Sequence, residues 1–120
     1  MGVLALDPVQ VSIPAGEEAR ATALYRDLPA MEVVEKPAPM RANGGAWFRS
    51  GRAELHLGVE PDFPPARKAH PALRADNLDA LGMVCESAGF EIFWDDRYLG
   101  VRRFYVADPF GNRVEIMQPG

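Results

Sequence analysis

Residues 107–118 read ADPFGNRVEIMQ, a turn followed by a strand, and this stretch decides the fold. The letters DPFGN are typical of a turn, because proline presets φ while glycine and asparagine tolerate positive φ. In the strand that follows, neighbouring side chains point to opposite faces, so Glu115 lies opposite its apolar neighbours. A carboxylate in so apolar a strand is costly to bury unless it is paired, protonated or bound to a metal.

The same order of elements occurs twice along the chain. Alternation and helical periodicity predict a strand, a helix and three strands at 9–13, 16–28, 31–34, 46–49 and 54–59. They predict the same order again at 70–75, 78–88, 90–94, 103–107 and 113–118. The segment 61–69 is rich in proline and reads as a stiff linker. The sequence therefore predicts one domain, residues 1–120, built from module 1 (about 7–60) and module 2 (about 70–118).

Composition narrows the class of protein. The chain has 120 residues, of which 48% are hydrophobic and 25% charged, enough for a single domain with its own core. A net charge of −4 argues against a nucleic-acid partner or an anionic membrane surface. No apolar run approaches the roughly 18 residues that a membrane span needs, and no secretory signal is recognisable. The single cysteine, Cys85, is expected to be buried and unpaired, which favours a cytoplasmic protein.

The duplication relates four positions that carry chemistry. His56 lies in the last strand of module 1, at the place that Glu115 occupies in module 2. His70 opens the first strand of module 2, and its counterpart in module 1 is Pro8. If the sheets curve into a trough, His56, His70 and Glu115 are expected to converge inside it. Two imidazoles and one carboxylate suit a divalent iron, manganese, nickel or zinc ion with open positions.

The duplicated modules, the LHLG strand around His56 and the ending DPFGNRVE resemble the vicinal oxygen chelate superfamily. That group includes glyoxalase I, extradiol dioxygenases, fosfomycin resistance enzymes and bleomycin resistance proteins. The resemblance covers nearly the whole chain and implies an α+β fold, in which two βαβββ modules form a curved, mainly antiparallel sheet trough with helices outside. It also implies metal ligands at Pro8, His56, His70 and Glu115. Proline has no ligating side chain, so three of these four positions retain a donor.

Polar and aromatic residues are expected around this site. Arg103 and Tyr105 are expected to hold an anionic or carbonyl-bearing substrate and to act together with Glu115. The expected substrate pocket consists of Gln10, Trp47, Trp94, Arg103 and Tyr105. A purely structural interpretation is equally open, in which Glu115 forms an ion pair with Arg103 or Arg113.

Three functions remain open from the sequence. The first is a divalent-metal-dependent lyase, isomerase or ring-cleaving dioxygenase that uses His56, His70 and Glu115. The second is a metal-free protein of the bleomycin resistance type that sequesters a small ligand, with Pro8 as its telling residue. The third is an interaction module with a vestigial pocket. Members of the superfamily often pair, so a homodimer is expected, with a small molecule as ligand.

Overall fold

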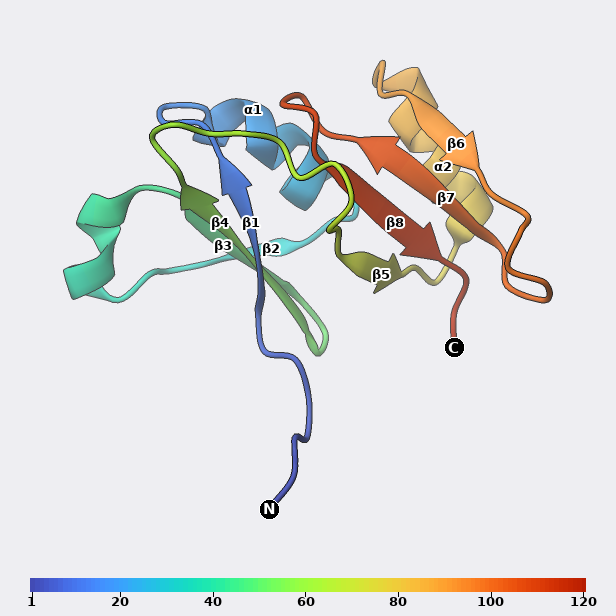
Figure 1. The fold of residues 1–120 in the computed structure, drawn as a ribbon, viewed down its shortest axis with the longest axis horizontal. Helices are drawn as coiled ribbons and strands as arrows, with labels where there is room; N and C mark the ends of the chain where they lie inside the picture. The colour runs from blue at the N-terminus through green and yellow to red at the C-terminus, as the bar shows by residue number, and fades with distance from the viewer.

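The computed structural model describes residues 1–120 and shows two modules side by side (Figure 1). Module 1 contains β1 (Val9–Ile13), α1 (Glu18–Thr22), the π-helix η1 (Ala23–Asp27), β2 (Glu32–Val34), the 3-10 helix η2 (Ala38–Asn43), β3 (Ala46–Ser50) and β4 (Ala53–Val59). Module 2 contains β5 (Ala72–Arg74), α2 (Leu78–Ser87), β6 (Ile92–Trp94), β7 (Arg103–Ala107) and β8 (Arg113–Met117). The predicted α+β fold of two βαβββ modules is confirmed.

Each module forms its own four-stranded sheet. The strand orders are β1-β4-β3-β2 and β5-β8-β7-β6, so the two sheets have the same topology. In each, the first strand pairs in parallel with the last, and the remaining pairs are antiparallel. Trp47 on β3 lies opposite His56 on β4, as Tyr105 on β7 lies opposite Glu115 on β8. The predicted equivalence of His56 and Glu115 is therefore visible in the register.

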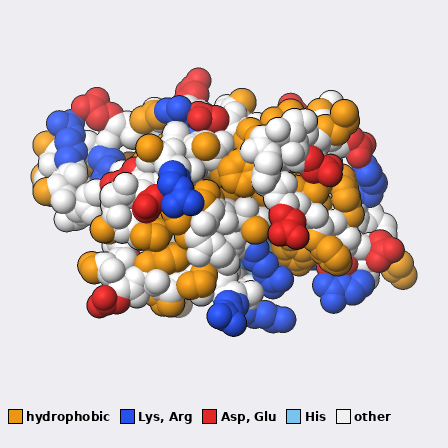
Figure 2. Space-filling view, turned by 90° about the horizontal axis from the view of Figure 1, so that it is seen from above, with side chains coloured by type: hydrophobic (Ala, Val, Ile, Leu, Met, Phe, Trp, Pro, Cys, Tyr) orange, Lys and Arg blue, Asp and Glu red, His pale blue; other side chains and the backbone are white.

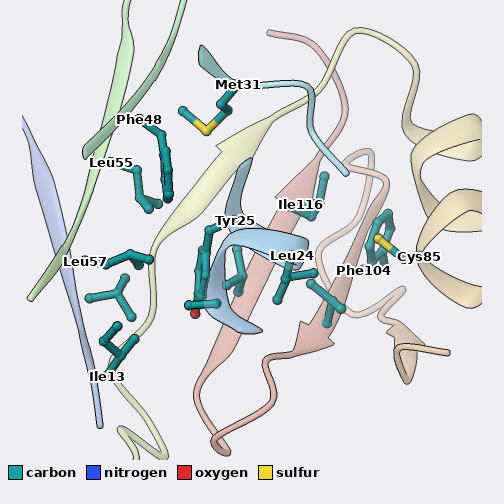
Figure 3. Packing of buried hydrophobic residues seen from close by; sticks show 14 of the residues in the cluster. Ile13, Leu24, Tyr25, Met31, Phe48, Leu55, Leu57, Cys85, Phe104 and Ile116 are labelled. Atoms are coloured by element: carbon teal, nitrogen blue, oxygen red, sulfur yellow. The ribbon is translucent and has the colours of Figure 1, made fainter. Parts of the chain in front are cut away.

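The core lies between the sheets and the helices. Figure 3 shows η1 between the two sheets, with its Leu24 and Tyr25 directed at buried side chains of both modules. Cys85 of α2 is buried against the second sheet and is unpaired, as predicted. The fifteen buried apolar residues are Val11, Ile13, Ala21, Leu24, Tyr25, Met31, Phe48, Leu55, Leu57, Leu78, Cys85, Phe104, Val106, Val114 and Ile116. The apolar side chains of each sheet are buried on the side that faces the helices, so polar side chains of the same strands lie on the opposite side.

The DPFGN turn joins the two modules. Asp108 accepts a hydrogen bond from the hydroxyl of Tyr25 on η1 (2.7 Å) and one from Asn112 Nδ2 (2.9 Å). Asn112 Nδ2 also donates to the carbonyl of Ser12 on β1 (2.9 Å), and its Oδ1 accepts from the linker nitrogen of Ala66 (2.9 Å). Burial, and then the charge of Asp108, raise the pKa of Tyr25 far above its usual range, so the hydroxyl stays protonated and donates. We call Tyr25, Asp108 and Asn112 the clasp.

The upper face of the molecule is mixed in composition (Figure 2), and a cavity beside η1 is mainly apolar. Acidic and basic side chains are interspersed with apolar ones over the upper face of the molecule (Figure 2). This cavity, of about 660 Å³, lies among the end of η1, β5 and the start of α2, and eleven of its sixteen lining residues are hydrophobic. None of the helices has the length and hydrophobicity that a membrane span requires.

Candidate functional site

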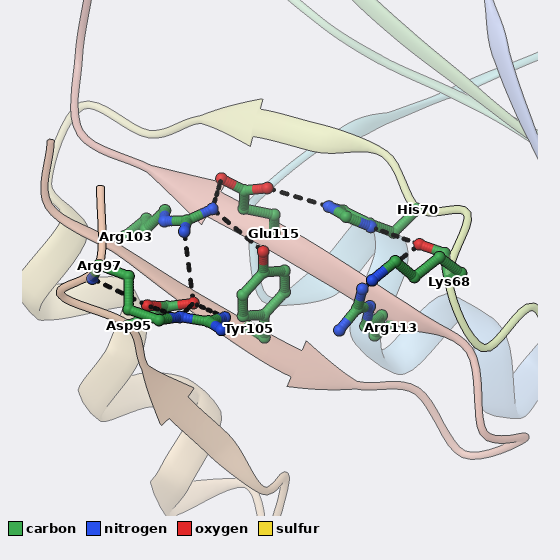
Figure 4. A network of polar contacts seen from close by, with 8 residues as sticks. All are labelled: Lys68, His70, Asp95, Arg97, Arg103, Tyr105, Arg113 and Glu115. Carbon is green, nitrogen blue, oxygen red and sulfur yellow. Dashed lines mark hydrogen bonds and ion pairs between the residues drawn. The ribbon is translucent and has the colours of Figure 1, made fainter.

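The second sheet presents a polar face on the side away from the core. Arg103 and Tyr105 of β7, and Arg113 and Glu115 of β8, alternate with the buried residues of their strands and so share one face. His70, which precedes β5, adds its imidazole to this face (Figure 4). These five residues are called the polar face below.

Glu115 is bound on both of its oxygens. His70 Nε2 lies 3.0 Å from Oε1, and Arg103 Nη1 lies 3.1 Å from Oε2 (Figure 4). The Glu115 side chain is only 8% exposed and that of Arg103 only 13%. Burial alone would raise the pKa of Glu115, but the hydrogen bonds from His70 and Arg103 outweigh it and bring the pKa below its usual value. Glu115 is therefore an ionised carboxylate within an ion-pair network.

Arg103 links this carboxylate to the loop that follows β6. Its Nη1 donates to the Tyr105 hydroxyl (3.0 Å), and its Nη2 lies 3.3 Å from Asp95 Oδ2. Asp95 is almost fully buried and also accepts from the side chain and backbone nitrogen of Arg97. Because of these bonds from Arg97, and then the charge of Arg103, the pKa of Asp95 lies far below its usual range. Asp95 thus anchors the loop at one end of the polar face.

The ring of Tyr105 lies at the centre of the polar face. The His70 ring meets it edge-on, with centroids 5.3 Å apart. The guanidinium carbons of Arg103 and Arg113 lie 5.5 and 4.8 Å from the centroid of the same ring. Cations within about 6 Å of an aromatic face are attracted by its electron density. Tyr105 therefore positions three nitrogen-bearing side chains around one surface.

The first sheet holds a separate group. The rings of His56 and Trp47 are stacked, with centroids 3.9 Å apart and an interplanar angle of 9°. His56 Nε2 lies 2.9 Å from Glu54 Oε2, and Gln10 lies opposite His56 on β1. No group of three or more His, Cys, Asp and Glu side chains in the chain lies close enough to hold a metal ion. The structure thus brings Glu115, His70, Arg103 and Tyr105 together, but it places His56, Trp47 and Gln10 elsewhere.

The expectation for Trp94 needs correction. Trp94 lies opposite Phe104 of the core, and a Cβ added to Gly82 of α2 would stand 3.2 Å from its ring. Trp94 therefore packs on the helix side of the sheet. Its neighbour Phe93 lies opposite Tyr105 and is 63% exposed on the polar-face side. The aromatic residue of β6 on the polar-face side is therefore Phe93 and not Trp94, since a shift of one residue along a strand exchanges the two faces of the sheet.

Three residues of this site escaped the sequence analysis. Asp95, Arg97 and Tyr98 belong to a loop without periodicity, so no pattern placed them beside Arg103. The sequence suggested Arg113 only as an ion-pair partner of Glu115. Arg113 lies two residues before Glu115 on β8, so both side chains are on the same face of the sheet. Its side chain instead lies over Tyr105. The alternation that placed Glu115 would also have placed Arg113 on this face.

A solved structure with the same architecture decides the family. The chain is 40% identical to a glyoxalase family protein of Bacillus anthracis, with a TM-score of 0.93 over 100% of this chain and 98% of the other. This chain belongs to the glyoxalase family. It is thereby a member of the vicinal oxygen chelate superfamily, as its sequence indicated.

More distant structures share the fold of this glyoxalase family protein. A lactoylglutathione lyase of Agrobacterium tumefaciens is 22% identical, with a TM-score of 0.67 and coverage of 92% of this chain and 91% of the other. A bleomycin-binding protein solved with bleomycin is 17% identical, with a TM-score of 0.71 and coverage of 98% and 100%. Neither a protein-family model nor a curated protein matches the sequence.

The donors of one chain do not fit the metal site implied for this glyoxalase family protein. Pro8 offers no ligating side chain. His56 lies in module 1, where its Nε2 contacts Glu54 of the same strand. Both oxygens of Glu115 are already engaged, one of them by the permanent positive charge of Arg103. A guanidinium at this distance competes electrostatically with a divalent cation for the same carboxylate.

Proposed function

We propose that this glyoxalase family protein binds a small organic molecule on the polar face of its second sheet and needs no metal ion to do so. The observation that carries the proposal is the bonding of Glu115. Its two oxygens bind His70 and Arg103, so the carboxylate is satisfied by the protein itself. Its task on this interpretation is to orient these two side chains for a ligand.

The polar face offers complementary contacts to such a ligand. The Tyr105 ring and the exposed Phe93 opposite it form an aromatic surface, and the guanidinium groups of Arg103 and Arg113 lie beside this surface. Aromatic surfaces with a few placed polar groups are typical of small-molecule sites. The fold of the bleomycin-binding protein, solved with its ligand, supports a binding role for this architecture.

The proposal predicts that ligand binding survives removal of metal. We expect that benzamide or benzoate, added to chelator-treated ¹⁵N-labelled protein, shifts the backbone amide signals of Tyr105 and Glu115. Signals of Trp47 and His56 on the first sheet are the internal control and should not move. Tyr105→Ala should abolish the shifts, because the variant removes the central ring. Absence of any shift on β7 and β8 with both compounds would reject the proposal.

The second candidate is a divalent-metal-dependent lyase or dioxygenase. His70 Nε2 and Glu115 Oε1 lie 3.0 Å apart, a spacing that two adjacent ligands of one ion also have. This candidate requires a further donor, such as His56 supplied by a second copy in a homodimer. It also requires Arg103 to release Glu115. Iron, manganese, nickel and zinc remain the ions to test.

A further inference from the structure

Arg113 is the one guanidinium of the polar face without a carboxylate partner. Arg103 pairs with both Asp95 and Glu115, and Arg97 of the adjoining loop pairs with Asp95. The only hydrogen bond of the Arg113 side chain joins Nη2 to the carbonyl of Lys68, at 3.4 Å. Its Nε, like that of Arg103, is buried and has no hydrogen-bond partner in the chain. A buried donor that is left unpaired is costly, so this atom calls for a partner.

The charges of the polar face are also unbalanced. Together with the adjoining loop, the polar face has three guanidinium groups, those of Arg97, Arg103 and Arg113, and only two carboxylates, those of Asp95 and Glu115. Arg113 supplies the excess positive charge. It is held in place over the Tyr105 ring, 4.8 Å from the centroid, so its orientation is fixed before a ligand arrives. A single negative charge beside Arg113 would complete the balance.

We propose that the ligand carries a carboxylate, which Arg113 binds beside the ring of Tyr105. This inference rests on the proposed function and names its ligand class. A planar carboxylate matches the fork of a guanidinium and accepts two parallel hydrogen bonds from it. The Lys68 carbonyl, which also contacts His70 Nδ1 (2.9 Å), accepts a hydrogen bond from Nη2 of this guanidinium (3.4 Å). The remainder of an aromatic acid would then extend over Tyr105.

The test compares benzoate with benzamide, which have the same shape and differ in charge. In calorimetric or NMR titrations, benzoate is expected to bind the chelator-treated protein at least about tenfold more tightly than benzamide. Arg113→Gln should remove this preference, whereas Arg113→Lys should restore part of it. Arg102→Gln is the matched control, because Arg102 pairs with Asp79 of α2 on the helix side.

A direct readout is the side-chain Nε–H signal of Arg113, which benzoate should shift and benzamide should not. Equal binding of the two compounds, or an unchanged preference in Arg113→Gln, would overturn the carboxylate inference and leave the proposed function standing. Failure of both compounds to bind would overturn the proposed function itself. The two proposals are therefore separable in one set of titrations.

Discussion

Replacing Glu115 by glutamine is expected to lower the free energy of unfolding by about 3 kcal/mol. The variant keeps the shape of the side chain but leaves the guanidinium of Arg103, only 13% exposed, with one carboxylate partner in place of two. Breaking a buried ion pair is costly because the remaining charge stays desolvated. Urea unfolding followed by circular dichroism measures the effect as a lower midpoint at unchanged slope.

The pH dependence of stability is the internal check on this result. Because the pKa of folded Glu115 lies below the ordinary value of 4.5, the unfolded chain binds the proton more tightly. The stabilisation is therefore complete above pH 4.5 and is lost as the pH falls through the lower folded-state value. Wild-type stability should fall more steeply on acidification than that of Glu115→Gln. Equal slopes in the wild type and Glu115→Gln would contradict the account.

Replacing Asp108 by alanine is expected to cost about 4 kcal/mol of stability. The change removes the carboxylate that accepts hydrogen bonds from the Tyr25 hydroxyl and from Asn112 Nδ2 in the clasp. The same carboxylate accepts from two backbone N–H groups of the turn, which also lose their acceptor. A buried donor without an acceptor has lost its hydrogen bonds to water and forms none within the protein, which lowers the stability of the fold. Urea unfolding of this variant is the measurement.

Tyr25→Phe is the matched control for the clasp. It removes one hydroxyl and keeps the ring, so it should cost about 1 kcal/mol. If Asp108→Ala costs no more than Tyr25→Phe, the turn does not depend on Asp108 and the clasp does not join the modules. The comparison isolates the carboxylate, since both variants lose the same bond between η1 and the turn.

The sequence predicted the fold because its signals are local and repeated. Alternation in β4 and β8 placed His56 and Glu115 at equivalent positions, and the register confirms that equivalence. Turn chemistry identified residues 108–112, although their function as a clasp depends on contacts with Tyr25 and Ser12 far away in the sequence. Local patterns contain no information about such contacts.

The candidate site was less predictable for a geometric reason. Whether His56 reaches Glu115 depends on how the two sheets are placed, and this is set by the packing of η1 between them. Trp94 was assigned to the polar face because short apolar strands such as β6 lack a clear alternation, and an error of one residue reverses the faces. Asp95 was not found because loop residues follow no period.

The most direct test of the account is a calorimetric titration of chelator-treated protein with zinc, nickel, manganese and, without oxygen, iron. The same titration is run on Glu115→Ala and on Pro8→His. We expect no one-to-one binding in the natural chain, because Glu115 is committed to His70 and Arg103 and Pro8 supplies no donor. Tight one-to-one binding that disappears in Glu115→Ala would contradict the account and establish a metal site.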